Sequence, residues 1–183
     1  DVGEFKIRFF EDEAPNAVQN FKTLAKEGFY DNKSVYNIQK AEDESEGKVY
    51  NIAFMTGASD EKGAEGKSVV NDGQPYPKEL SYNLYPFPGA IAAYSDDKTC
   101  DSRFFVVGES PISESVIKGM EVAQFPELIQ NKFKEVGGVP GLTHSYTIFA
   151  QIFEGYDVAQ QIIQVETDDT GKPVNDIFIN SVT

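Results

Sequence analysis

The sequence predicts a mainly β protein in which short antiparallel strands form a barrel or a sandwich with attached helices. Three observations lead to this fold class. Many short apolar or alternating segments are separated by turn residues, a few segments have helical spacing, and strands and helices do not alternate regularly. Because no internal repeat and no linker divides the 183 residues, we expect a single domain over residues 1–183.

The first expected elements are a strand and a helix. Apolar residues alternate with charged residues over 5–9, which is the period of a half-buried strand. Pro15 suits the first turn of a helix, and Gly28 is placed to end that helix. Because apolar residues recur at helical spacing between them, we expect a helix near 15–27, followed by a turn and a strand near 35–38.

The middle and the end of the chain contain most of the remaining expected strands. Each is a short apolar run bounded by turn residues or by polar loops. These runs cover residues 49–55, 89–94, 103–107, 147–153 and 177–179.

A helical pattern interrupts the strands over residues 109–140. Pro126 opens a segment whose apolar residues share one face, and Gly137 ends it, which predicts a helix near 126–136. A further helix is expected near 156–163. We therefore expect a helical insert at about 109–140 in an otherwise β-rich chain.

The charge balance limits the partners of the protein. Lysine and arginine number 16 against 30 acidic residues, for a net charge of −14. This acidity argues against a nucleic-acid partner and against docking on an anionic membrane surface. No apolar run approaches the roughly 20 residues of a membrane span. Since a strand pattern begins almost at once, we expect that any targeting segment has been removed.

Several motifs that carry chemistry in other proteins lead to no function here. His144 is the only histidine, which excludes a site of several histidines, and the acidic segment 42–46 is best interpreted as a solvated loop. Cys100 lies among acidic residues that would raise its thiol pKa. The glycine-rich segment 63–68 has Glu61 where a phosphate-binding loop needs its first glycine. We therefore expect neither a metal nor a cofactor.

A series of segments along nearly the whole chain matches one known pattern in the same order. The segments are residues 3–7, 14–21, 28–31, 54–60, 89–95, 101–106, 142–149 and 155–158. Together they resemble the cyclophilin-type peptidyl-prolyl cis-trans isomerases. For example, Phe-Met-Thr-Gly-Ala-Ser-Asp at 54–60 is similar to the family's Phe-Met-x-Gln-Gly-Gly-Asp. Residues 109–140 resemble the insert of bacterial surface-anchored cyclophilins.

The resemblance implies a closed eight-stranded antiparallel barrel with capping helices and a groove for proline on its outer face. It also implies that the partners are proline-containing peptide or protein segments. Rotation about an amide bond meets a barrier of about 18–20 kcal/mol, and an isomerase lowers it by stabilising the twisted state. In the family an arginine does this. The insert and the expected removal of a targeting segment suggest an extracytoplasmic or cell-surface location, with a cytoplasmic one left open.

The apolar positions of the family's groove are retained in this sequence. The resemblance places them on Phe54, Met55, Phe105 and Leu142. These residues would hold the proline ring. Apolar residues on strands are also commonly part of the core, so their presence supports the fold more firmly than the activity.

The polar positions of the groove have changed. The family's arginine falls on Asn37, its first glutamine on Gly57 and its second glutamine on Arg103. Its alanine–asparagine pair falls on Tyr94 and Ser95, and its groove histidine on Tyr146. A neutral amide lacks the permanent charge and the forked donors of a guanidinium. We therefore expect strongly reduced catalysis.

Three functions remain open at this point. The first is an active isomerase with a rebuilt site, in which Arg103 is a possible substitute for the arginine. The second is a protein that binds extended segments without useful catalysis. The third is a structural or interaction module with a closed groove. Asn37 favours the second and third functions, and the bulk of Tyr94 favours the third over the second.

Overall fold

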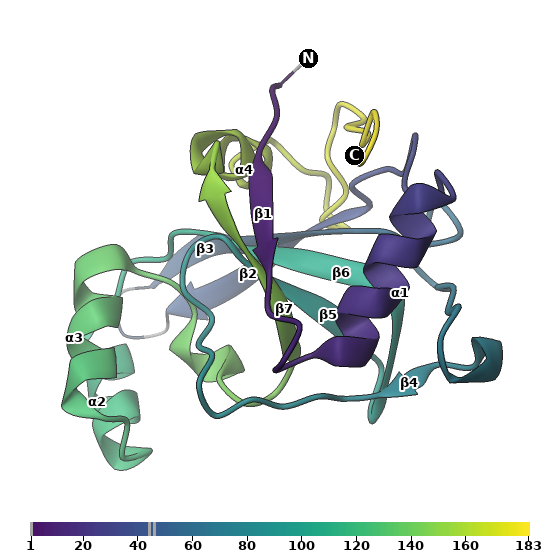
Figure 1. The fold of residues 1–183 in the computed structure, drawn as a ribbon. Helices are drawn as coiled ribbons and strands as arrows, with labels where there is room; N and C mark the ends of the chain where they lie inside the picture. Colours follow the sequence, from purple (N-terminus) through teal and green to yellow (C-terminus); the bar gives the residue numbers. More distant parts are fainter. Residues whose placement is uncertain (1, 44, 46) are drawn as a thin grey trace.

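In a computed structural model, which describes residues 2–43, 45 and 47–183, the strands form a single antiparallel sheet (Figure 1). Their order is β1-β7-β5-β6-β3-β2, with β4 paired to β6. The strands are β1 (Lys6–Phe9), β2 (Asn37–Asp43), β3 (Lys48–Thr56), β4 (Tyr76–Pro77), β5 (Ala90–Ser95), β6 (Thr99–Val107) and β7 (Thr147–Glu154). The predicted mainly β, antiparallel class is confirmed.

Four helices accompany this sheet in the described part of the chain. They are α1 (Pro15–Lys26), α2 (Glu114–Val122), α3 (Glu127–Val136) and α4 (Tyr156–Ile163), with short 3-10 turns η1 (Asn71–Gly73) and η2 (Pro140–Leu142). The three helices expected from the sequence are confirmed to within one residue. Helix α1 packs on β6 and β7, and α4 packs on β3. Within the described ranges, no helix combines the length and the apolar character needed to cross a bilayer.

The closure of the sheet is not confirmed. Seven strands are paired in the described part of the chain, and the path of pairing runs from β1 at one edge to β2 at the other. The closed eight-stranded barrel implied by the resemblance therefore stays a prediction.

The end of the chain differs from the sequence-based expectation. A strand was expected over 177–179, and this prediction is wrong. Phe178 forms a single bridge with Ser34, flanked by backbone hydrogen bonds of Ile177 and Ile179. Because the residues on either side do not continue the ladder, the contact is too short to form a strand.

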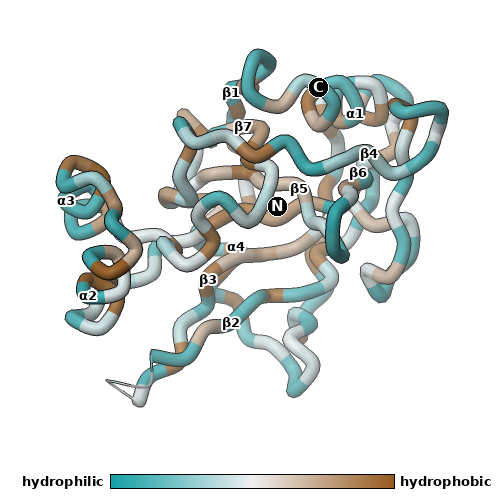
Figure 2. The backbone as a smooth tube through the Cα atoms, turned by 90° about the horizontal axis from the view of Figure 1, so that it is seen from below, coloured by the Kyte–Doolittle hydropathy of each residue, from teal (hydrophilic) through white to brown (hydrophobic). Residues whose placement is uncertain are grey.

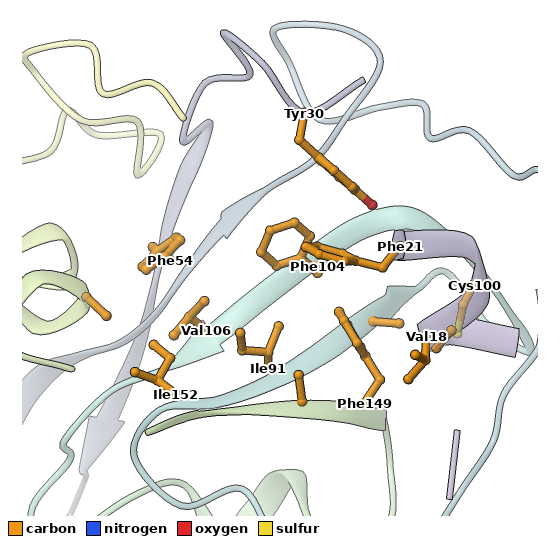
Figure 3. Close-up of a cluster of buried hydrophobic side chains, with 14 of the residues drawn as sticks. Val18, Phe21, Tyr30, Phe54, Ile91, Cys100, Phe104, Val106, Phe149 and Ile152 are labelled. Carbon is orange, nitrogen blue, oxygen red and sulfur yellow. The ribbon is translucent and has the colours of Figure 1, made fainter. Parts of the chain in front are cut away.

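The central strands carry apolar side chains on both faces of the sheet. On one face Phe54, Phe104 and Val106 join side chains from α1 in the larger hydrophobic cluster (Figure 3). On the other face Met55 and Phe105 belong to a second cluster. Successive residues of a strand point to opposite faces, so one stretch of sequence supplies both clusters.

The insert of residues 109–140 contains α2 and α3, which project from one side of the sheet (Figures 1 and 2). Phe133 of α3 is fully buried, and its ring centroid lies 4.4 Å from that of Phe87. After α3 the chain returns to the sheet, where Val139 and Leu142 pack against the second cluster. The insert is thus anchored at an aromatic contact and leads directly into η2.

The N-terminus of α1 is capped by Glu79, which comes from outside the helix. One carboxylate oxygen accepts hydrogen bonds from the backbone N–H of Asn16 at 3.0 Å and from its side-chain amide at 2.8 Å. The other oxygen accepts the backbone N–H of Ala17 at 3.0 Å. The two backbone N–H groups have no partner inside the helix, because they belong to its first turn. A negative charge is also favourable at this end of the helix dipole.

We predict that Glu79→Gln lowers the free energy of unfolding by about 1 kcal/mol, because the amide loses the charge and one acceptor. Urea unfolding measures the change. Glu121→Gln is the control, since Glu121 is exposed on α2, and it should change stability by less than about 0.5 kcal/mol. Equal losses in the two variants would contradict the capping role.

Candidate functional site

A pocket of about 620 Å³ opens on the second face of the sheet. Its apolar floor consists of Met55, Phe105 and Leu142. Met55 and Phe105 are direct partners across β3 and β6, so their side chains lie next to each other. The ring of Tyr146 stands edge-on to Phe105, with 5.0 Å between the centroids. The strand register and η2 together build this floor.

Phe54 was expected beside these residues, and the structure places it elsewhere. Its side chain is 3% exposed and lies in the larger cluster on the opposite face (Figure 3). Phe54 precedes Met55 on the same strand, so the alternation of β3 directs only one of the two toward the pocket. Phe54 therefore packs in the core on the other face of the sheet, behind the floor of the pocket.

Asn37, which the resemblance assigns to the position of the family arginine, lines the pocket. It begins β2 and is the register partner of Met55. Its side-chain N–H donates to the backbone oxygen of Thr170 at 3.0 Å, and its oxygen accepts from the amide of Gln39 at 2.6 Å. The same Gln39 nitrogen lies 3.1 Å from the sulfur of Met55. The amide of Asn37 is thus engaged on both sides.

The sequence analysis missed several pocket residues, among them Gln39 and two residues of the segment 168–172. Gln39 could have been found, because it follows Asn37 by two positions and shares its face of the strand. The segment 168–172 could not, since no local pattern connects it with β2. Its backbone oxygen at Gly171 accepts the N–H of Ile38 at 2.7 Å, which holds the segment beside Asn37 as one wall of the pocket.

Gly57 and Ser95 lie outside the lining of the pocket. Gly57 has φ of +81°, and a Cβ there would stand 2.5 Å from the backbone oxygen of Ser102. Ser95 is buried, and its hydroxyl has no hydrogen-bond partner in the part of the chain that is described. Tyr94, by contrast, lines the pocket. Of the changed polar positions, Asn37, Tyr94 and Tyr146 therefore reach the pocket.

Arg103 is buried beside the pocket and does not line it. Its Nε and Nη2 atoms donate to the Asp101 carboxylate at 3.0 and 2.7 Å, and Nη2 also donates to Asp96 at 2.8 Å. Burial opposes the charge, yet the hydrogen bonds to the two carboxylates raise the pKa of Arg103 above its ordinary value. The cations that line the pocket, within the described residues, are Lys62 and Lys172.

Burial keeps two potentially reactive groups protonated. It raises the pKa of Tyr36, a pocket-lining residue whose hydroxyl has no hydrogen-bond partner among the described residues. It also raises the pKa of the Cys100 thiol to about 11. Neither group supplies a base or a thiolate near neutral pH.

No metal centre is seen within the described residues, where no three His, Cys, Asp or Glu side chains gather in a suitable arrangement. In the acidic segment 42–46, Glu44 and Glu46 lie outside the described residues. The lining of the pocket is mostly apolar and aromatic, with amide and lysine groups and the single carboxylate of Glu61 among the described residues. Its residues suit an extended chain with an apolar side group better than an ion.

Comparisons with known proteins agree on one family. A sequence model described as cyclophilin-type peptidyl-prolyl cis-trans isomerase/CLD matches residues 1–183. Curated relatives from Staphylococcus saprophyticus and Staphylococcus aureus are 28% and 26% identical over 181 residues, covering 98% of this chain and 86% of each relative. Both carry provisional peptidyl-prolyl cis-trans isomerase names.

Solved structures show the same fold. A cyclophilin-type isomerase of Cryptosporidium parvum, crystallised in the presence of the dipeptide Ala-Pro, superimposes with a TM-score of 0.71. The match covers 99% of this chain and 92% of that one, at 19% identity. A second structure of the same protein gives the same TM-score and covers 90% of that chain. Because the identity is low, this likeness establishes the fold alone.

The loop at residues 60–66, which contributes Glu61, Lys62 and Gly63 to the pocket, is organised by a carboxylate. Asp60 accepts the backbone N–H groups of Lys62 and Glu65, each at 2.7 Å. These hydrogen bonds, led by that of Glu65, hold the pKa of Asp60 below its ordinary value.

We predict an acid-dependent loosening of this loop. Since the folded-state pKa of Asp60 is lowered, its stabilisation is present above the usual value of about 3.9 and is lost as the pH falls through the lowered pKa. The amide resonances of Lys62 and Glu65 should shift in that window by NMR, while that of Ile148 in β7 should not. Asp60→Asn should abolish the titration. A midpoint above the usual value would contradict the prediction.

Proposed function

Because the chain belongs to the cyclophilin-type peptidyl-prolyl cis-trans isomerase family, we propose that it binds extended Xaa-Pro segments in this pocket and isomerises them only slowly. The observation that carries the proposal is the composition of the pocket. Its floor is apolar, and its lining contains no arginine within the described part of the chain.

The floor supports binding of a proline ring. Met55 and Phe105 are 6% and 5% exposed, so they are held firmly by the sheet, while Leu142 and Tyr146 remain half-buried at the opening. The pocket volume lies in the range that accepts a small ligand group. Ala-Pro, present with the related Cryptosporidium protein, is a suitable minimal probe.

The polar groups support weak catalysis. Twisting an Xaa-Pro amide frees the lone pair of the proline nitrogen, and a catalyst must stabilise that state more than the planar one. The side chain at the family's arginine position is the neutral Asn37, whose N–H already donates to Thr170. Loss of one preorganised donor typically raises a barrier by about 2.7–4 kcal/mol, or roughly 10²–10³ in rate.

A second candidate function is a structural or interaction module whose pocket takes no proline. Two observations favour it. Tyr94 adds bulk to the pocket wall, and segment 168–172 packs directly against Asn37. Because the net charge is −14, we propose protein rather than nucleic-acid partners for either function.

We also propose an extracytoplasmic or cell-surface location. The proposal rests on the insert with α2 and α3, which resembles that of surface-anchored cyclophilins. Fractionation of the source cells with an antibody to this chain tests it, and recovery in the cytoplasmic fraction would contradict it.

We predict an isomerase rate at least a hundredfold below that of an active cyclophilin, which corresponds to about 2.7 kcal/mol. Exchange NMR on an Ala-Pro peptide, with an active cyclophilin measured alongside, tests this. Asn37→Arg should restore little, because Gly57 and Ser95, at the positions that would fix the peptide backbone, do not line the pocket. Near-normal turnover of the wild type would show that another group replaces the arginine.

We further predict that Leu142→Ala weakens binding of the same peptide about fivefold, since it removes roughly 1 kcal/mol of apolar contact. NMR titration measures the affinity. Leu128→Ala, at a leucine 79% exposed on α3, is the matched control and should leave the affinity unchanged. If saturating peptide shifts no resonance of Met55 or Tyr146 in the wild type, the interaction module becomes the better description.

A further inference from the structure

We propose that Arg103 is a positioning residue, which clamps loop 60–66 and the ring of Tyr94 together as one wall of the pocket. The proposal extends the proposed function, since it assigns to that pocket a wall on which peptide affinity depends. It differs from a catalytic role for Arg103, because Arg103 is not among the residues that line the pocket and its guanidinium is occupied by protein groups.

The guanidinium joins the loop to the sheet. Its Nη1 atom donates to the backbone oxygens of Gly63 and Ala64, at 3.2 and 3.0 Å. Its other two nitrogens are held by Asp101 and Asp96, as described above. All three nitrogens are thus used, and a single side chain on β6 connects two carboxylates with two carbonyl groups of the loop.

Two glycines allow the loop to approach this closely. A Cβ on Gly66 would overlap the carboxylate of Asp101, and a Cβ on Gly63 would overlap the ring of Tyr36. Gly63 also has φ of +76°, a conformation that other residues rarely adopt. This contact explains the glycine-rich segment 63–68, which does not match a phosphate-binding loop. The two glycines thus let the loop lie in contact with Asp101 and close enough to accept hydrogen bonds from Arg103.

The same guanidinium holds Tyr94. Its central carbon lies 4.8 Å from the centroid of the Tyr94 ring, a cation–π distance. Tyr94, Lys62 and Gly63 all line the pocket, so the side chain that binds the loop also supports the ring beside it. A peptide whose proline sits on the Met55–Phe105 floor would have this wall at its side. Removal of Arg103 should therefore loosen the wall and leave the floor intact.

Two substitutions test the clamp, one in the arginine itself and one in the loop that it holds. Arg103→Lys keeps the charge near Asp101 and cannot bridge two carboxylates and two carbonyls at once. Gly66→Ala leaves Arg103 unchanged and pushes the loop away from Asp101. The matched controls are Lys98→Gln, at an exposed lysine in the turn before β6, and Gly119→Ala, at a glycine of α2 with open space around it. Arg103→Gln removes the charge as well, and it is included in both measurements when its hydrogen exchange in β6 and β7 matches that of the wild type.

The first measurement is hydrogen exchange without peptide. Three backbone N–H groups report on the loop. That of Ser59 donates to the backbone oxygen of Glu65, and that of Glu65 donates to the Asp60 carboxylate. That of Lys67, at the end of the loop, donates to the Ser102 hydroxyl. Each clamp variant should raise their exchange at least tenfold, while amides of β6 and β7 keep their wild-type rates. Faster exchange in loop and strands alike would mean that Arg103 only stabilises the whole fold, and would overturn the proposal.

The second measurement is the affinity for the Ala-Pro peptide. Both clamp variants should bind about tenfold more weakly than the wild type, and both controls should bind as the wild type does. Unchanged affinity in variants with a loosened loop would overturn the role in the pocket. If the wild type itself binds no peptide, the proposed function fails, and loop exchange then decides alone whether Arg103 holds this wall.

Discussion

The pairing of Met55 with Phe105 across β3 and β6 is the constraint on which the rest of the structure depends. In the same register Phe54 pairs with Val106 on the opposite face, within the larger hydrophobic cluster. A slip of one residue would exchange the two faces and place Phe54 in the pocket and Met55 in the core. The register therefore sets the floor of the pocket and the centre of the core together.

This double role accounts for the pattern that the resemblance assigns to the sequence, in which the apolar groove positions are retained and the polar ones are changed. Met55 and Phe105 are almost fully buried, so they pack the fold whether or not a peptide is bound. The two positions that the resemblance assigns to the family's arginine and second glutamine make polar contacts instead. Here they are an asparagine held by a neighbouring loop and an arginine buried in an ion cluster.

Both walls of the pocket contain a loop in which an aspartate side chain accepts hydrogen bonds from nearby backbone N–H groups. Asp60 accepts backbone N–H groups of loop 60–66, and Asp168 accepts those of Thr170 and Lys172 in the other wall. Each carboxylate shapes its own loop locally, as aspartates commonly do in turns. The position of each loop then depends on a long-range contact, Arg103 for the first and Asn37 with Ile38 for the second.

The sequence by itself determined the strand-rich class and the helices near 15–27, 126–136 and 156–163, and through the resemblance it assigned Asn37 to the position of the family's arginine. These follow from periodicity, from proline and glycine signals, and from motifs that are local in the chain. Only the tertiary structure decided that Phe54 faces the core, that Arg103 is enclosed by Asp96 and Asp101, and that segment 168–172 reaches Asn37. The physical reason is that strand register and loop contacts join residues far apart in the chain, and a local pattern does not specify such partners.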